Sequence, residues 1–180
     1  KAFVRQVMLE LKEEKIPYDE TIPLGVMIEI PSIAAIADLA AAEVDFASIG
    51  TNDLCQYACA VDRMNPELAD YYQTFSPAFL RMLHQIIGAF CRAGKEISIC
   101  GEMAGDPQAT ALLAGMGLKK FSASAASLPR IKREMSMFTL EEAHALTQKA
   151  LQARTQSEVV ALVESARIER TKTDEKVQNE

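Results

Sequence analysis

The chain has 180 residues, of which 49% are hydrophobic and 24% charged; these values are typical of a soluble globular domain and exclude general disorder. Its formal net charge of −6 is unfavourable for binding a nucleic-acid backbone. No apolar run is long enough for a membrane span, and the first residues carry no signal-peptide pattern, so we expect a cytoplasmic location without membrane contact.

The predicted elements alternate between helix and strand. Residues 1–15 place apolar side chains at helical spacing, which predicts an amphipathic helix. The run LGVMIEI at 24–30 is typical of a buried parallel strand, and an alanine-rich helix is expected directly after it. VDFASIG at 44–50 predicts the second strand. A helix, a loop and a short helical turn are expected between residues 51 and 75.

The second half of the chain continues this alternation. Ser76 followed by proline is a helix start, and apolar residues then keep helical spacing until Gly94. Strands are predicted at 95–100 and 119–124, with a helix between them. The remaining expectations are a helix near Leu128–Met135, a capping box at Thr139–Glu142 that opens another helix, a last helix at about 157–167, and a polar, frayed tail at 168–180.

Strands that alternate with helices predict an α/β fold, in which a parallel sheet is flanked by helices. A complete (β/α)8 barrel takes roughly 250 residues. Four strands are predicted in 180 residues, so the pattern favours the second half of such a barrel. A small open sheet is the alternative.

Polar or reactive side chains recur at the carboxyl end of each predicted strand. Glu29 lies at the end of the first strand, and Asn52 and Asp53 follow the second. Cys100 ends the third strand, and serines lie near the end of the fourth. Loops and helix N-termini converge at this edge of parallel α/β folds, so we expect the ligand site there.

The charged residues near this edge have alternative interpretations. Glu29 interrupts an apolar strand, where it can form a structural ion pair or, together with Asp53, bind a hard cation such as Mg²⁺. Asp53 can equally cap its helix. Arg63 can pair with Asp62 or Asp70 at the surface, or hold a phosphate or carboxylate group.

The cysteine spacing matches no zinc site or CxxC pair, and the chain has only two histidines. These counts disfavour a histidine-rich metal site and a serine–histidine catalytic site. Cys55, Cys59 and Cys91 are predicted to pack in the interior, and His84 and His144 to lie on solvated helix faces.

Three separated motifs, GVMIEIPS, DFASIGTNDLCQYACAVDR and ICGEMAGDPQAT, together resemble a known family. They are similar to the phosphoenolpyruvate (PEP)-binding barrel of enzyme I, the PEP–protein phosphotransferase of the bacterial sugar phosphotransferase system. The resemblance covers residues 1–167, including LLAGMGLKKFSASAASLPRIK. Pyruvate phosphate dikinase and PEP synthase share the architecture, but their cysteine motif carries a histidine and a second glycine where this chain has Met103 and Ala104.

The resemblance implies a TIM-barrel type fold, of which this chain is the C-terminal half, and transfer of the PEP phosphoryl group to a histidine on another domain. Pyruvate is the second product. Glu29 and Asp53 are implied as Mg²⁺ ligands, Asn52 and the backbone near Asp53 as contacts to PEP, and Arg63 as a contact to its phosphoryl group. Cys100 is implied as the proton donor to C3 of the enolate, since a free thiol is mostly protonated at neutral pH.

The resemblance further implies a homodimer through this region and, as a partner, the phosphohistidine domain of the same parent protein. The 180-residue piece alone is expected to bind substrate weakly and to transfer no phosphate at an appreciable rate. Three other functions stay open. The chain can be a relative of pyruvate phosphate dikinase or PEP synthase, a Mg²⁺-dependent lyase or aldolase acting on pyruvate-like acids, which has no need of Cys100, or a non-enzymatic dimerisation or regulatory module.

Overall fold

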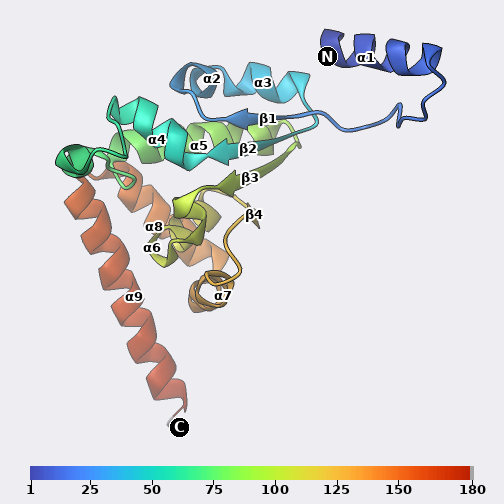
Figure 1. The fold of residues 1–180 in the computed structure, drawn as a ribbon. Coiled ribbons are helices and arrows are strands. Elements are labelled where there is room, and N and C mark those ends of the chain that lie inside the picture. The colour runs from blue at the N-terminus through green and yellow to red at the C-terminus, as the bar shows by residue number, and fades with distance from the viewer. Residues whose placement is uncertain (179–180) are drawn as a thin grey trace.

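The fold is α/β and is built on one parallel sheet of four strands (Figure 1). It is seen in a computed structural model that describes residues 1–178. The strands lie in the order β1–β2–β3–β4, so each strand pairs with the next one along the chain. The strands are β1 (Gly25–Ile28), β2 (Phe46–Gly50), β3 (Glu96–Cys100) and β4 (Lys120–Phe121).

The predicted helices and strands are present, and two of the helices and one strand differ most from their predicted extent. The alanine-rich helix is divided at Ile36, whose backbone leaves the helical conformation at ψ 32°. The helix predicted at 157–167 is longer, because α9 continues to Gln178 and so enters the polar tail, whose residues 179–180 lie outside the described part. The strand predicted at 119–124 is reduced to two residues. The helices are α1 (Ala2–Glu13), α2 (Pro31–Ala35), α3 (Ala37–Glu43), α4 (Thr51–Cys59), η1 (Pro66–Tyr71), α5 (Pro77–Arg92), η2 (Glu102–Gly105), α6 (Pro107–Gly115), α7 (Leu128–Met137), α8 (Leu140–Gln152) and α9 (Gln156–Gln178).

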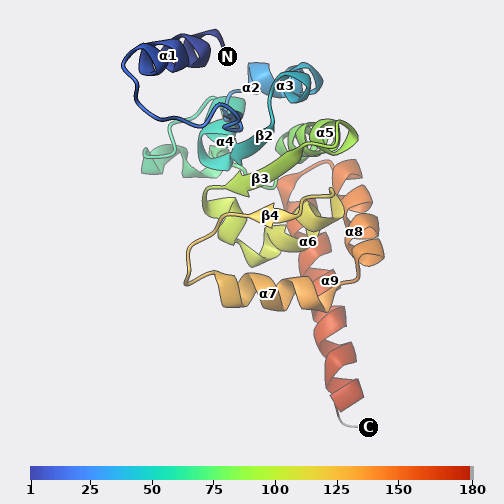
Figure 2. The same ribbon diagram turned by 90° about the vertical axis from the view of Figure 1, so that its right-hand side faces the viewer.

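The helices α5, α6 and α8 lie on one side of the sheet, as the two perpendicular views show (Figure 1 and Figure 2). A doubly wound sheet carries helices on both faces and reverses its strand order at a switch point. Strands that follow one another in sequence order with helices on one side are instead the arrangement of a (β/α)8 barrel. The predicted α/β fold is therefore confirmed, and the sheet is consistent with part of a TIM barrel.

The core lies between the sheet and α5. Ser76 accepts a hydrogen bond from the Phe79 N–H and so caps α5, as the sequence predicts. Every second residue of the strands faces this helix, because side chains alternate across a strand. Burying these apolar faces against each other holds the sheet to its helices. The fully buried large side chains of this region are Ile28, Ile49, Phe79, Leu80, Leu83, Ile86, Ile87, Phe90 and Ile99.

Two segments are more exposed than their sequence predicts. The strand β1 is at the edge of the sheet, and of its four residues only Ile28 is buried, so the expectation of a strand buried on both faces is wrong. The amphipathic helix α1 has the predicted position but buries no residue, and Phe3 is 79% exposed. Within residues 1–178, no helix combines the length and the apolar character that crossing a membrane requires.

Candidate functional site

The register of the sheet places the ends of its first three strands side by side. Gly50 of β2 pairs with Cys100 of β3, and Glu29 follows directly after Ile28, the partner of Ile49. The Glu29 side chain lies over Gly50, where a Cβ atom would be 3.0 Å from Glu29 Oε2. Glycine at position 50 therefore leaves the space that this carboxylate occupies.

Glu29 is half-buried and carries a carboxylate that is free to accept a ligand. Among the described residues, this carboxylate forms no hydrogen bond and no ion pair. The structural ion pair considered for Glu29 is therefore absent from this part of the chain. A half-buried carboxylate without a partner loses hydration without compensation, which is the situation that a bound cation relieves.

The Cys100 thiol is half-buried and lies outside the hydrophobic core. Its Sγ donates a hydrogen bond to the Ile49 carbonyl oxygen at 3.4 Å and lies 3.7 Å from Met27 Sδ. Met27 is 48% exposed, whereas the neighbouring Ile99 is fully buried on the helix-covered side. The thiol thus points to the face of the sheet opposite α5, as does the side chain of Met27.

Asn52 connects the turn after β2 to the turn after β3. Its Oδ1 accepts a hydrogen bond from the backbone N–H of Glu102 at 2.9 Å. The Tyr72 hydroxyl donates to the Asn52 carbonyl oxygen at 3.2 Å, and the Thr51 hydroxyl donates to the Cys100 carbonyl oxygen at 2.7 Å. Burial raises the pKa of Tyr72 to about 12, so this hydroxyl stays a donor at neutral pH. These contacts fix the two turns against each other.

Gly101 makes the close approach of these turns possible. Its φ of +89° is a conformation that other residues rarely adopt, and a Cβ atom there would be 2.5 Å from Thr51 Oγ1 and 2.7 Å from Asn52 Oδ1. The sequence analysis missed the roles of Thr51 and Tyr72. The position of Thr51 directly after a predicted strand was a usable signal for its role, but no local pattern indicates the role of Tyr72.

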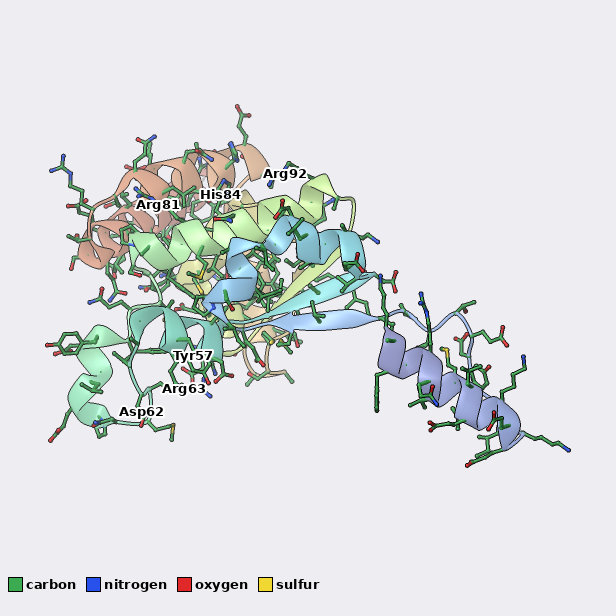
Figure 3. The ribbon with its side chains drawn as sticks, turned by 90° about the horizontal axis from the view of Figure 1, so that it is seen from above. Tyr57, Asp62, Arg63, Arg81, His84 and Arg92 are labelled. Atoms are coloured by element: carbon green, nitrogen blue, oxygen red, sulfur yellow. The ribbon has the colours of Figure 1, made fainter. Side chains whose placement is uncertain are left out.

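Arg63 pairs with Asp53 rather than with the two aspartates considered from the sequence. Its Nη1 lies 3.0 Å from Asp53 Oδ1, and the side chains are 32% and 43% exposed respectively. Asp62 instead accepts a hydrogen bond from the Met64 N–H. Figure 3 shows Arg63 near Tyr57 and beside α4, the helix that carries Asp53. An exposed pair of this kind contributes little stability, so its guanidinium can be recruited by a ligand.

The donor set at this edge fits a magnesium ion in its chemistry. Glu29 offers a carboxylate without a partner, and Asp53 has one oxygen engaged by Arg63. No cluster of three or more histidine, cysteine, aspartate or glutamate side chains able to hold a metal occurs among the residues that the structure describes. Mg²⁺ commonly takes one or two protein carboxylates and leaves its other positions to water and substrate oxygens, as this set requires.

The remaining thiols and histidines lie away from the strand ends. Cys55 is buried, as predicted, and burial raises its pKa to about 12, so its thiol stays protonated. Cys91 is exposed, so its predicted packing is wrong, since it lies at the edge of the apolar face of α5. His84, on α5 in Figure 3, was expected to be solvated, but its Nδ1 is buried without a partner and burial lowers its pKa. His144 is exposed, as predicted.

Comparisons with known proteins agree with the motifs at these strand ends. Residues 1–140 match the family described as PEP-utilising enzyme, PEP-binding domain. The chain is 45% identical over 165 residues to the phosphoenolpyruvate-protein phosphotransferase of Buchnera aphidicola, covering 92% of this chain and 29% of that protein. The proteins of the same name from Staphylococcus carnosus and Haemophilus influenzae are 46% and 45% identical over 164 and 169 residues, which are 91% and 94% of this chain. The chain spans about 29% of the length of these relatives.

Proposed function

The chain belongs to the PEP-utilising enzymes through their PEP-binding domain, and from this we infer that it is the PEP-binding part of a PEP–protein phosphotransferase. In the proposed reaction, the bond between phosphorus and the enol oxygen of PEP breaks. The phosphoryl group passes to a histidine nitrogen on another domain, and the enolate left behind takes a proton at C3 to become pyruvate. A cytoplasmic location and a homodimeric parent are part of this proposal.

We assign the binding of PEP to Asn52, Asp53 and Arg63. The Oδ1 atom of Asn52 is engaged by the Glu102 N–H, which leaves the Asn52 amide N–H groups as donors for an anionic substrate. Among the described residues, the Arg63 guanidinium is engaged only through Nη1, by Asp53, so its other N–H groups can hold the phosphoryl oxygens. Glu29 and Asp53 would hold Mg²⁺, which when bound stabilises negative charge on the enolate and phosphoryl oxygens.

Cys100 is assigned as the proton donor, and its position is the observation that supports the proposal most. The thiol is free, half-buried and directed to the open face of the sheet, at the register position next to Gly50 and Glu29. It gives its proton to C3 of the enolate and is left as a thiolate. The Sγ atom lies 3.4 Å from the Ile49 carbonyl oxygen, an acceptor for a thiol, and this contact supports the assignment.

The phosphoryl acceptor is proposed to come from elsewhere. His84 lies on α5 with Nδ1 buried, and His144 lies on α8 with Nδ1 3.2 Å from the Gly115 carbonyl oxygen. Among the described residues, neither histidine forms a hydrogen bond with Glu29, Asn52, Asp53, Arg63 or Cys100. For this reason we expect the 180-residue chain alone to transfer no phosphate at an appreciable rate.

Cys100→Ala tests the assignment in a full-length phosphotransferase that carries this segment. General acid catalysis contributes about 10²–10⁴-fold to a rate, so pyruvate release should fall by at least about 100-fold. Binding of PEP, measured by calorimetry with Mg²⁺, should stay within about twofold of the wild type, because the thiol holds no part of the ground-state substrate.

Cys91→Ala is the matched control, since Cys91 is an exposed thiol on α5 outside the site. It should leave both measurements unchanged. Pyruvate release at the wild-type rate by the Cys100→Ala protein would contradict the proton-donor role and favour the lyase. Absence of Mg²⁺-dependent PEP binding would contradict the enzymatic proposal as a whole and favour the dimerisation module.

A further inference from the structure

A second site lies among the helices, apart from the strand ends. A cavity of about 700 Å³ that is open to solvent lies between α7 and α9, and Pro107 at the start of α6 also lines it. This volume is within the usual range of small-molecule sites, which is roughly 300–1,000 Å³. Nothing in the proposed phosphotransfer uses it, because its walls contain none of the residues assigned to PEP or Mg²⁺.

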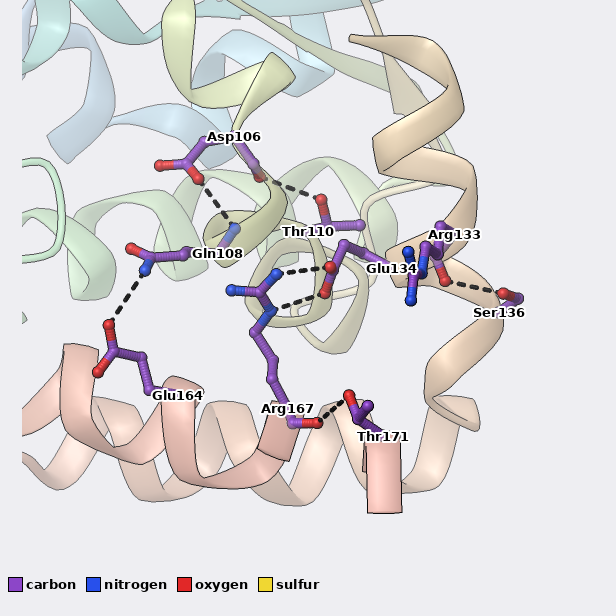
Figure 4. A network of polar contacts seen from close by, with 9 residues as sticks. All are labelled: Asp106, Gln108, Thr110, Arg133, Glu134, Ser136, Glu164, Arg167 and Thr171. Atoms are coloured by element: carbon purple, nitrogen blue, oxygen red, sulfur yellow. Dashed lines mark hydrogen bonds and ion pairs between the residues drawn. The ribbon is translucent and has the colours of Figure 1, made fainter. Parts of the chain in front are cut away.

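One wall of the cavity is held by an ion pair with matched geometry. Arg167 Nε lies 2.9 Å from Glu134 Oε2, and Arg167 Nη2 lies 2.7 Å from Glu134 Oε1, so the pair is bidentate (Figure 4). Glu134 is only 6% exposed, and the hydrogen bonds it accepts raise the pKa of Arg167. The pair fixes the Arg167 guanidinium between α7 and α9, with Nη1 outside the bidentate contact.

The helix α7, which carries Glu134, presents two further guanidinium groups to the cavity. Arg130 and Arg133 are three residues apart on α7, so they lie on neighbouring turns of the same helix face. Within the described residues, neither guanidinium forms an ion pair. Glu134 is neutralised by Arg167, and Glu164 accepts a hydrogen bond from Gln108 Nε2 at 3.4 Å. The lining thus holds three guanidinium groups and two carboxylates, and Asp106 outside the lining also acts on Arg167, so Arg130 and Arg133 are the cations left for a ligand.

Apolar side chains complete the lining. Met137 of α7 and Ile168 of α9 both line the cavity, and Ile168 is 55% exposed, so its side chain is accessible to a ligand. We propose that the cavity binds a small organic phosphate, whose dianionic group is held by Arg130 and Arg133 and whose apolar body contacts Met137 and Ile168. Guanidinium groups suit this role because they match phosphate oxygens in pairs.

Calorimetry with phenyl phosphate on the 180-residue chain tests the proposal, with EDTA present to exclude Mg²⁺-dependent binding at the strand ends. The Arg130→Gln/Arg133→Gln protein should bind at least tenfold more weakly than the wild type. The Lys12→Gln/Lys132→Gln protein removes the same net charge from exposed positions outside the cavity, and it should bind within twofold of the wild type. Inorganic phosphate should bind several-fold more weakly than phenyl phosphate, because it lacks the apolar body.

A second variant separates loss of the site from loss of the fold. Ile168→Glu keeps all three arginines and places a carboxylate in the cavity, so it should also weaken binding at least tenfold while the circular dichroism spectrum stays unchanged. No measurable binding of phenyl phosphate to the wild type would overturn the proposal. So would equal weakening by the two charge-removing double variants, or equal affinity for the two phosphates.

Discussion

Two features require glycine at position 101. Its φ is positive, and its Cα lies close to the turn after β2. Its φ is +89°, and a Cβ atom would collide with Thr51 Oγ1 and Asn52 Oδ1 at 2.5 and 2.7 Å. Gly94 has a similar φ of +64° but no atom within 4 Å of the position of a Cβ atom. Gly94 therefore has a positive φ without the contact, whereas Gly101 combines the contact with a ψ of −175°, a backbone conformation that only glycine adopts readily.

We predict that Gly101→Ala lowers the free energy of unfolding by roughly 3 kcal/mol, because strain and overlap add. Gly94→Ala should lower it by only about 1 kcal/mol, the cost of the left-handed conformation alone. Urea unfolding of the two proteins measures the difference. PEP binding should weaken in the Gly101→Ala protein but not in the Gly94→Ala protein, since of these two glycines only Gly101 lies against Asn52. Equal losses of stability would show that the contact with Asn52 does not require glycine.

At the scale of the element, α8 carries a capping box that gives its stability a pH dependence. The Thr139 hydroxyl accepts a hydrogen bond from the Glu142 N–H, and the Glu142 carboxylate accepts one from the Thr139 N–H. The bond from the Thr139 backbone lowers the pKa of Glu142 below its ordinary value of 4.5, and Arg170 of α9 adds to this effect. Folding therefore favours the ionised carboxylate. The resulting stabilisation is present above pH 4.5 and is lost as the pH falls through the lower pKa of the folded state.

Glu142→Gln should remove this dependence. The difference in free energy of unfolding between wild type and variant should be largest near pH 7 and should shrink as the pH falls below 4.5. Glu141→Gln is the control, because Glu141 is an exposed carboxylate in the same first turn that is not part of the capping box. Urea unfolding across this pH range measures both. A difference that stays constant with pH would contradict the assignment.

Elements that depend on local signals could be predicted from the sequence, and elements that depend on distant contacts could not. The caps at Ser76 and Thr139 are fixed by residues within three positions, and the structure shows both. The burial of β1 was overestimated, because an apolar run does not reveal whether anything covers each face. The end of α9 was placed too early, because apolar periodicity fades after Arg167 although no proline or glycine follows.

The candidate site divides in the same way. Glu29 and Cys100 could be placed at one edge because both end a predicted strand, and parallel strands share their carboxyl edge. The pairing of Arg63 with Asp53 and the contact from Tyr72 could not, because they depend on how the loop after α4 folds back. The magnesium and substrate roles of these residues remain predictions.

At the scale of the whole molecule, the face of the sheet opposite α5 exposes apolar side chains. Side chains on this face include Met27, 48% exposed, and Phe46, 38% exposed, and β1 is an edge strand. Phe46 packs over Gly25, where a Cβ atom would be 2.2 Å from its ring. Apolar side chains beside an unpaired strand edge favour association with another chain.

We therefore predict that the 180-residue chain self-associates in a concentration-dependent manner, as sedimentation velocity can measure. Met27→Lys should weaken this association at least tenfold, because a charge on the open face must be desolvated when that face is covered. Met64→Lys is the matched control, since Met64 is 80% exposed in the loop after α4, away from the sheet. It should leave the association unchanged. A monodisperse monomer at high concentration would contradict the predicted self-association. If Met27→Lys and Met64→Lys weakened the association equally, the contact between chains would not be on this face of the sheet.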